Sequence, residues 1–196
     1  MKMSKLEKKF VNSRRHAQRN LRLLRPLLDQ IDSDQITKVL EIGCGAGIVA
    51  ATLKEKYNMN VTGTDVDPEQ IEMAKRYHQE SERLRFLEAD ATKLPFGNRE
   101  FEMVLALHVL HHIGEWQAAL EEVNRVLKPK GYFVLADLAF SRFLTKMLRP
   151  VVKNYGLYTI DDVITAMRGN RFETVYKKGP RGLLPKHCRL VFQKAS

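Results

Sequence analysis

Features that would place this chain in several other classes are scarce or missing. Its 196 residues include only two cysteines, Cys44 and Cys188, whose number and spacing fit neither a disulfide framework nor a zinc site. The start of the chain holds no apolar signal core, and the longest apolar run near its middle, residues 103–110, is far shorter than the roughly 18 residues that cross a bilayer. These absences predict a cytoplasmic protein in a reducing setting, with no transmembrane segment.

Repeats are also missing, and acidic residues are scarce at both ends of the chain. Residues 1–28 hold nine Lys and Arg against one acid, and residues 168–196 hold eight against one, within a formal net charge of +10. Basic ends of this kind are suited to binding RNA phosphates, an acidic small molecule or an anionic membrane surface. A role in solubility alone explains them equally well. Hydrophobic residues make up 44% of the chain, enough for one core, so residues 1–196 are expected to form a single domain.

Strand and helix patterns alternate along the chain. Residues 1–30 have apolar residues mostly three or four positions apart, which predicts a basic helical segment that Pro26 should kink or restart. A turn is predicted at 128–131, and a capping box at Thr159 begins a last helix. This alternation predicts an α/β fold with a mostly parallel sheet and helices on both faces. The predicted strands are residues 37–42, 60–65, 84–88, 101–107, 132–138, 172–177 and 188–193, and the main helices are residues 48–57, 67–81 and 115–127.

Three glycines follow the first predicted strand. Gly43, Gly45 and Gly47 form a turn without side chains, where backbone amides and a helix N-terminus can approach a ligand closely. A dinucleotide fingerprint would require its third glycine at position 48, which is Ile48. A phosphate-binding P-loop is excluded because no Gly-Lys-Ser/Thr follows the turn.

Carboxylates stand at the ends of the next two predicted strands. Asp65 ends the second strand, where a carboxylate can accept both hydroxyl protons of a ribose. Its plain alternative is helix capping, which Asp67 already supplies. Asp90 follows the third strand and can accept from an adenine amine, while the amide of Ala91 can donate to a ring nitrogen. Two acids at successive strand ends beside a glycine turn therefore predict a cofactor that contains adenosine.

The residues also resemble a known family over roughly residues 37–138. The chain resembles the class I S-adenosylmethionine (SAM)-dependent methyltransferases, and within them the ubiquinone/menaquinone-biosynthesis, or methyltransferase type 11, group. The resemblance implies a Rossmann-like, seven-stranded sheet with a C-terminal antiparallel strand pair, SAM as cofactor and S-adenosylhomocysteine as product. The segments that carry it are Val39-Leu-Glu-Ile-Gly-Cys-Gly-Ala-Gly47, Gly63-Thr-Asp-Val-Asp-Pro68, Phe86-Leu-Glu-Ala-Asp-Ala-Thr-Lys-Leu-Pro-Phe96, residues 101–112 with Val109-Leu-His-His112, and Glu121-Glu-Val-Asn-Arg-Val-Leu-Lys-Pro-Lys-Gly131.

The resemblance also implies roles for single residues. The methionine end of SAM would lie on Glu41 and the backbone of Gly43 and Gly45, the ribose on Asp65, and the adenine on Asp90 with Ala91. Two positions depart from the family pattern, Glu102 and Lys130, and neither is expected to affect the cofactor. The complete set expected to bind the cofactor is Glu41, Gly43, Cys44, Gly45, Gly47, Asp65, Val66, Asp90, Ala91 and Leu107.

The acceptor side rests on fewer residues. His108, expected near the transferable methyl, is the candidate general base, with plain pocket lining as its alternative. Residues 139–158 are a candidate substrate cover, and His108, His112, Tyr155 and Tyr158 are candidate substrate contacts. His111 and His112 are expected to cap the following helix and to pack against the sheet rather than bind a metal, because no nearby acid or cysteine completes a ligand set.

The predicted enzyme is a methyltransferase acting on an oxygen or carbon nucleophile of a small molecule, and the basic ends suit an acidic one. The Asn/Asp-Pro-Pro-aromatic motif that similar enzymes use for nitrogen is missing, as is a Pro-Cys pair for attack on a pyrimidine. Two alternatives stay open: an RNA methyltransferase that uses the basic ends, and a non-catalytic SAM-binding partner subunit. The chain is expected to be a monomer or a homodimer.

Overall fold

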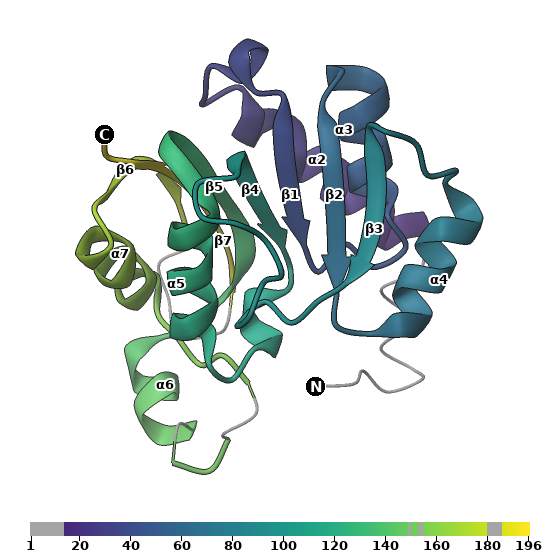
Figure 1. Cartoon of the computed structure of the whole chain (residues 1–196). Helices are drawn as coiled ribbons and strands as arrows, with labels where there is room; N and C mark the ends of the chain where they lie inside the picture. Colours follow the sequence, from purple (N-terminus) through teal and green to yellow (C-terminus); the bar gives the residue numbers. More distant parts are fainter. Residues whose placement is uncertain (1–13, 149, 153–154, 180–185) are drawn as a thin grey trace.

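The computed structural model describes residues 14–148, 150–152, 155–179 and 186–196. Seven strands form one sheet in the order β3-β2-β1-β4-β5-β7-β6 (Figure 1). The first five strands are parallel, and β7 runs antiparallel to both β5 and β6, which confirms the predicted sheet and its terminal pair. The strands are β1 (Lys38–Ile42), β2 (Asn60–Asp65), β3 (Leu84–Glu88), β4 (Phe101–Leu107), β5 (Leu127–Ala139), β6 (Phe172–Lys178) and β7 (Lys186–Lys194).

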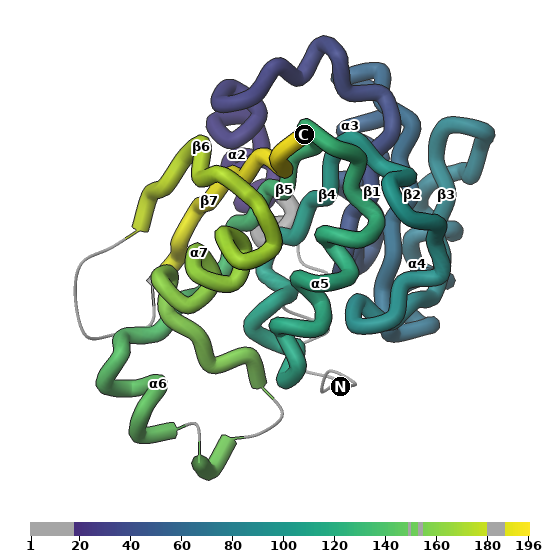
Figure 2. The backbone as a smooth tube through the Cα atoms, turned by 60° about the vertical axis from the view of Figure 1, so that its left-hand side comes forward, coloured from purple at the N-terminus to yellow at the C-terminus, as the bar shows by residue number. Residues whose placement is uncertain are grey.

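Helices cover both faces of this sheet (Figures 1 and 2). One face carries α2 (Arg14–Leu28), α3 (Ile48–Tyr57) and α4 (Pro68–Tyr77), and the other carries α5 (Trp116–Val126) and α7 (Ile160–Gly169). A shorter helix, α6 (Arg142–Leu148), lies beyond the carboxyl ends of the parallel strands in both views. Two single turns of 3-10 helix, η1 (Ser33–Gln35) and η2 (Leu110–His112), complete the elements. No helix of the described residues is long and apolar enough to cross a membrane.

The sheet separates two hydrophobic cores, because successive side chains of a strand point to opposite faces. In β1, Val39 belongs to the core under α2, α3 and α4, whereas Leu40 belongs to the core under α5 and α7. In β4, Met103 belongs to the core under α2, α3 and α4, and Val104 belongs to the core under α5 and α7. Strands in the centre of the sheet are buried on both faces and therefore contain continuous apolar runs. Such runs indicate a buried strand in the sequence.

Local predictions differ from the structure at three places. The helix expected at 67–81 ends at Tyr77. Pro26 does not start a new helix, because α2 continues through it to Leu28, where buried leucines on both sides of the proline outweigh its missing hydrogen bond. The turn expected at 128–131 is instead part of β5. Lys130 takes a left-handed φ of 63° there, and the pairing register of β4 and β5 shifts between Phe101 and Met103.

Glu102, one of the departures from the family pattern, joins the starts of three strands. Its Oε2 accepts from the backbone nitrogens of Thr37 and Lys38 at 2.7 and 2.9 Å, and its Oε1 accepts from Lys128 Nζ at 2.8 Å. Burial would raise the pKa of Glu102, but these hydrogen bonds outweigh burial and lower its pKa to about 2. The carboxylate therefore fixes the end of the sheet opposite the predicted cofactor site.

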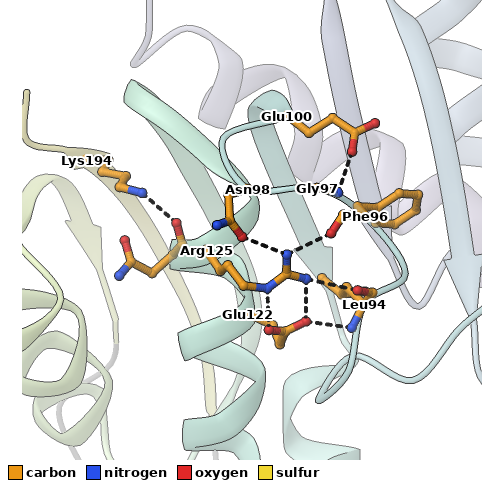
Figure 3. Close-up of polar contacts among 9 residues, drawn as sticks. Leu94, Phe96, Gly97, Asn98, Glu100, Glu122, Arg125 and Lys194 are labelled. Carbon is orange, nitrogen blue, oxygen red and sulfur yellow. Dashed lines mark hydrogen bonds and ion pairs between the residues drawn. The ribbon is translucent and has the colours of Figure 1, made fainter.

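Arg125 of α5 holds the loop between β3 and β4 (Figure 3). Its guanidinium pairs with Glu122 at 2.7 Å and donates to the carbonyl oxygens of Leu94 and Phe96 at 2.9 and 2.7 Å. Glu122 Oε2 in turn accepts from the backbone nitrogen of Leu94 at 2.6 Å. Bidentate, charge-assisted hydrogen bonds of this kind are strong, and they also restrict the orientation of both side chains. They position the loop that begins with Asp90 and Ala91.

Candidate functional site

The glycine turn between β1 and α3 admits no side chains at two of its positions. Gly43, Gly45 and Gly47 all take left-handed φ values, of 69°, 51° and 77°. A Cβ atom at Gly43 would lie 2.6 Å from the Cβ of Val109, and one at Gly47 would lie 2.6 Å from the ring of Phe86. Glycine is therefore required both by the backbone conformation and by the close packing. Gly47 is also the N-cap of α3, so the turn presents a helix N-terminus to the carboxyl end of the sheet.

Glu41 lies in β1 just before this turn and is only 3% exposed. Its Oε2 is buried and has no hydrogen-bond partner in the described structure. Burial raises the pKa of Glu41 to about 8, and the nearby charge of Asp65 adds to the rise. The backbone of Ala50 hydrogen-bonds to this carboxyl group and opposes the rise, but a buried oxygen without a partner is costly, so Oε2 calls for a cation or hydrogen-bond donor supplied by a ligand.

Asp65 ends β2 and joins two loops around the turn. Its Oδ2 accepts from the backbone nitrogen of Gly45 at 3.0 Å, and its Oδ1 accepts from that of Asp67 at 3.0 Å. Burial raises the pKa of Asp65, although the same hydrogen bonds oppose the rise. Each carboxylate oxygen can accept a second hydrogen bond, so the capacity to bind two hydroxyl groups remains.

Asp90 and Ala91 follow β3 and complete the wall of a cleft of about 590 Å³. Asp90 Oδ1 accepts from the backbone nitrogen and the hydroxyl of Thr92, both at 2.8 Å, which fixes the carboxyl group in place. The cleft therefore brings together residues from three strand ends and from the loop after β4. Its lining is Ile42, Gly43, Asp65, Val66, Ala89, Asp90, Ala91, Thr92, Val109, His112, Ile113, Gly114 and Glu115.

Two further residues of the expected cofactor set are buried beside the cleft. Cys44 lies inside the turn, where burial, followed by the charges of Glu41 and Asp65, raises the pKa of its thiol. A thiol of this kind is a poor nucleophile, which agrees with a purely spatial role. Leu107, the last residue of β4, is buried in the core shared with α3.

His108 follows β4 in a left-handed conformation, with φ of 55°. Its backbone nitrogen donates to the carbonyl oxygen of Ala136 in β5 at 2.8 Å. Its ring lies edge-on to the ring of His187 from β7, with 5.0 Å between centroids. Arg19 of α2 also contacts the Nε2 atom of His187, so strand β7 and helix α2 both contribute to this side of the site.

His111 forms a buried pair with Asp137 of β5. Its Nδ1 contacts Asp137 Oδ1, and its backbone nitrogen donates to Asp137 Oδ2 at 3.2 Å. Asp137 is 0% exposed. Burial would raise its pKa, but the hydrogen bonds from His111 and Leu138 and the nearby histidines outweigh burial and lower the pKa. An ionised carboxylate only accepts, so the proton lies on Nδ1 and leaves Nε2 of His111 as the basic nitrogen.

The other candidate substrate contacts separate into two environments. His112 lines the cleft, and its ring centroid lies 3.9 Å from that of His111 and 6.0 Å from that of Tyr155. Tyr158 is instead fully buried in the core, 5.3 Å from the ring of Trp116, where burial and the charge of Asp137 raise the pKa of its phenol. Tyr158 therefore packs in the core next to the site, whereas His112 lines the cleft.

The expected cap role of His111 and His112 is wrong. Both residues lie in η2, and Glu115 is the N-cap residue of α5. His111 turns toward Asp137 instead, because a buried carboxylate requires a donor. The sequence signal for this partner was the single acid in the apolar run of β5, and it was missed, as were His187 and Arg19. Among the described residues, no group of three or more His, Cys, Asp and Glu is arranged to hold a metal ion.

Known proteins match the chain over the part that builds this cleft. Residues 40–135 match the model of the methyltransferase domain family. An O-methyltransferase of Pyrenophora dematioidea is 35% identical over 103 residues, which are 51% of this chain and 39% of that protein. Methyltransferase GfsG of Streptomyces halstedii is 31% identical over 137 residues, which are 68% of this chain and 49% of that protein. The chain thus spans half the length, or less, of these two curated relatives.

A solved methyltransferase has the same fold over nearly the whole chain. It comes from Haloferax volcanii, was solved in complex with the Trm112 methyltransferase activator, and has a TM-score of 0.77. The likeness covers 98% of this chain and 95% of that one at 16% identity, and it therefore shows the fold alone. Because the matched domain contains the glycine turn and both strand-end carboxylates, the chain belongs to the class I SAM-dependent methyltransferases of the type 11 group, whose cofactor is SAM.

Proposed function

We propose that this protein transfers the methyl group of SAM to a hydroxyl oxygen of a small molecule, and that His111 is the general base. The observation that carries the proposal is the buried pair of His111 and Asp137 beside the cleft that His112 lines. The name of the O-methyltransferase relative supports the same class of acceptor. Proton removal helps methyl transfer to a hydroxyl group, which is a weak nucleophile while it keeps its proton.

The residues around the cleft fit SAM. The buried Oε2 of Glu41 suits the ammonium group of the methionine end, and Asp65 suits the ribose hydroxyls. Asp90 and Ala91 suit the adenine ring, and Gly43 places its backbone in the lining of the same cleft. When bound, SAM supplies a methyl group that its sulfonium makes electrophilic. The chain's own task is then to align the acceptor, which can remove about 7–11 kcal/mol from a barrier, and to exclude water.

His111 performs the proton transfer in this proposal. Asp137 holds its ring through Nδ1 and fixes the tautomer, so that Nε2 carries the lone pair that takes the hydroxyl proton. Asp137 also stabilises the positive ring that results. His108, whose ring is edge-on to that of His187, then lines the acceptor pocket and orients the substrate.

The experiment is transfer of labelled methyl from SAM to defined acceptors and to extract fractions separated into small molecules, RNA and protein. The proposal expects the label in small molecules, as the methyl group of an ether or an ester. Label in RNA would support instead the use of the basic ends on nucleic acid. Binding of SAM without transfer to any fraction would favour a non-catalytic partner subunit, in keeping with the Haloferax volcanii structure, which contains an activator.

A further inference from the structure

Helix α6 and the turn after it carry a ridge of exposed apolar side chains. Phe143 is 65% exposed, Met147 53% and Val151 81%. Phe143 and Met147 are four residues apart and therefore share one face of the helix. Of the seven large hydrophobic side chains that are exposed in the described structure, these three fall within nine residues, whereas single exposed residues need no explanation.

One side of α6 faces the protein, because Thr145 is buried. Its hydroxyl donates to the carbonyl oxygen of Ser141 at 2.9 Å. The hydroxyl of Ser141 accepts from the backbone nitrogen of Leu144 at 3.3 Å, as in a helix N-cap. Phe143 and Met147 therefore lie on the exposed side of a capped helix.

The charged side chains of α6 itself, Arg142 and Lys146, are both basic. Between Asp137 and Asp161 the sequence contains four basic residues and no acidic residue. Two of the four, Arg142 and Lys146, are exposed on α6 and line a hollow of about 370 Å³ together with Thr145, Pro150, Thr159 and Asp162. An apolar ridge with basic side chains beside it suits a surface that is apolar within and negatively charged outside.

We propose that the α6 ridge, Phe143, Met147 and Val151 with Arg142 and Lys146, docks on an anionic lipid surface. The apolar side chains enter the boundary of the acyl chains, and the two cations remain at the phosphate groups. A second copy of this chain would bring a net charge of +10 to a basic surface, and residues 1–13 would bring four lysines against one acid. Repulsion between like charges therefore disfavours the binding of either one to the ridge.

Helix α6, which carries the ridge, lies at the end of the molecule where the parallel strands end (Figure 1). After α6 the chain returns to the site, where the backbone nitrogen of Gly156 donates to the carbonyl oxygen of His111 at 2.9 Å. A protein docked through this ridge would present its acceptor side to the lipid. It follows, if the proposed function holds, that the acceptor is an amphiphile taken from the lipid surface.

The test is sedimentation of the full chain with vesicles, without SAM or acceptor, so that its result is independent of methyl transfer. Vesicles of phosphatidylcholine with phosphatidylglycerol are compared with phosphatidylcholine alone. We expect at least tenfold tighter binding to the anionic vesicles, and a loss of about tenfold in the Phe143→Ser/Met147→Ser variant. The matched control is Tyr77→Ser/Val175→Ser, which removes apolar side chains that are 65% and 45% exposed elsewhere. Arg142→Gln/Lys146→Gln should remove most of the preference for anionic lipid, whereas Lys56→Gln/Lys93→Gln should not.

Two results would overturn the inference. One is vesicle binding that is the same in the α6 variant and in the control variant. The other is a concentration-dependent dimer of the native chain that only the α6 variant abolishes in analytical ultracentrifugation, because the ridge would then bind a second copy. Circular dichroism of each variant confirms that the fold is intact before either result is read.

Discussion

The ring of His111, in the turn after β4, is held by the carboxylate of Asp137, 26 residues later in β5. Two parallel neighbouring strands end at the same edge of the sheet, and their next residues meet there. The carboxylate of Asp137 has 0% exposure, so its charge acts strongly on His111, which contacts it, and also on the nearby His108.

Replacing Asp137 with Asn should lower kcat by about 100-fold or more, because the amide no longer selects the Nδ1 tautomer of His111. The affinity for SAM, measured by calorimetry, should change little. The acidic limb of the kcat–pH profile, which reports protonation of the base, should also move. Asp161→Asn, which removes only an exposed contact with Lys177, is the matched control. An unchanged pH profile together with a merely less stable protein would mean that Asp137 is structural.

The two candidate bases can be separated by single alanine variants. We expect His111→Ala to reduce kcat by about 100-fold and His108→Ala by less than about tenfold, with the larger effect of His108→Ala on KM. Steady-state kinetics with one acceptor at several pH values checks this. If His108→Ala causes the larger loss of kcat instead, His108 is the base, as the sequence analysis expected.

Glu41→Gln should raise the stability of the ligand-free protein and weaken its binding of SAM. A carboxyl group whose folded-state pKa of about 8 exceeds its unfolded value makes folding less favourable as pH rises from about 4.5 to 8. The ligand-free variant should therefore gain about 4 kcal/mol at pH 8, with no gain near pH 4. Loss of the anion should weaken SAM binding about tenfold or more. Urea unfolding and calorimetry measure the two effects, with the exposed Glu72→Gln as control. Tighter or equal SAM binding would contradict the role proposed for Glu41.

Gly47→Ala should destabilise the protein by about 1–3 kcal/mol, because a residue with φ of 77° is strained and its Cβ would meet the Phe86 ring. SAM binding should weaken in the same variant. At Gly169 an added Cβ meets nothing within 4 Å, so Gly169→Ala should be neutral or slightly stabilising. Urea unfolding of both variants provides the comparison, and equal stabilities would show that the turn tolerates a side chain.

Glu102→Gln should cost about 1–3 kcal/mol at pH 7 by removing the anion that Thr37, Lys38 and Lys128 share. The folded-state pKa of about 2 lies below the unfolded value. Its contribution is therefore present above about pH 4.5 and is lost as pH falls toward 2. The stability difference between native protein and variant should thus shrink between pH 5 and pH 2 in urea unfolding. A difference that stays constant over this range would show that packing, rather than charge, is responsible.

The sequence was most informative where a local rule dictates the structure. The glycine turn, the strand-end carboxylates and the apolar runs of β1 and β4 were read correctly because each depends on neighbours in the chain. The capping box at Thr159 was also confirmed, since Thr159 and Asp162 exchange hydrogen bonds of 2.9 and 3.0 Å. The turn expected at 128–131 is instead an irregular part of β5, where the pairing with β4 skips from Leu127 to Tyr132.

By itself, the sequence determined the order of the strands and of the main helices, because periodicity is a local property, and its resemblance to a family indicated the cofactor. Only the tertiary structure decided which histidine faces a carboxylate. His111 and Asp137 are 26 residues apart and meet only when β4 and β5 pair. It likewise decided that Tyr158 is buried while Phe143 and Met147 are exposed. Burial depends on which faces of the folded chain meet, and no local pattern contains that information.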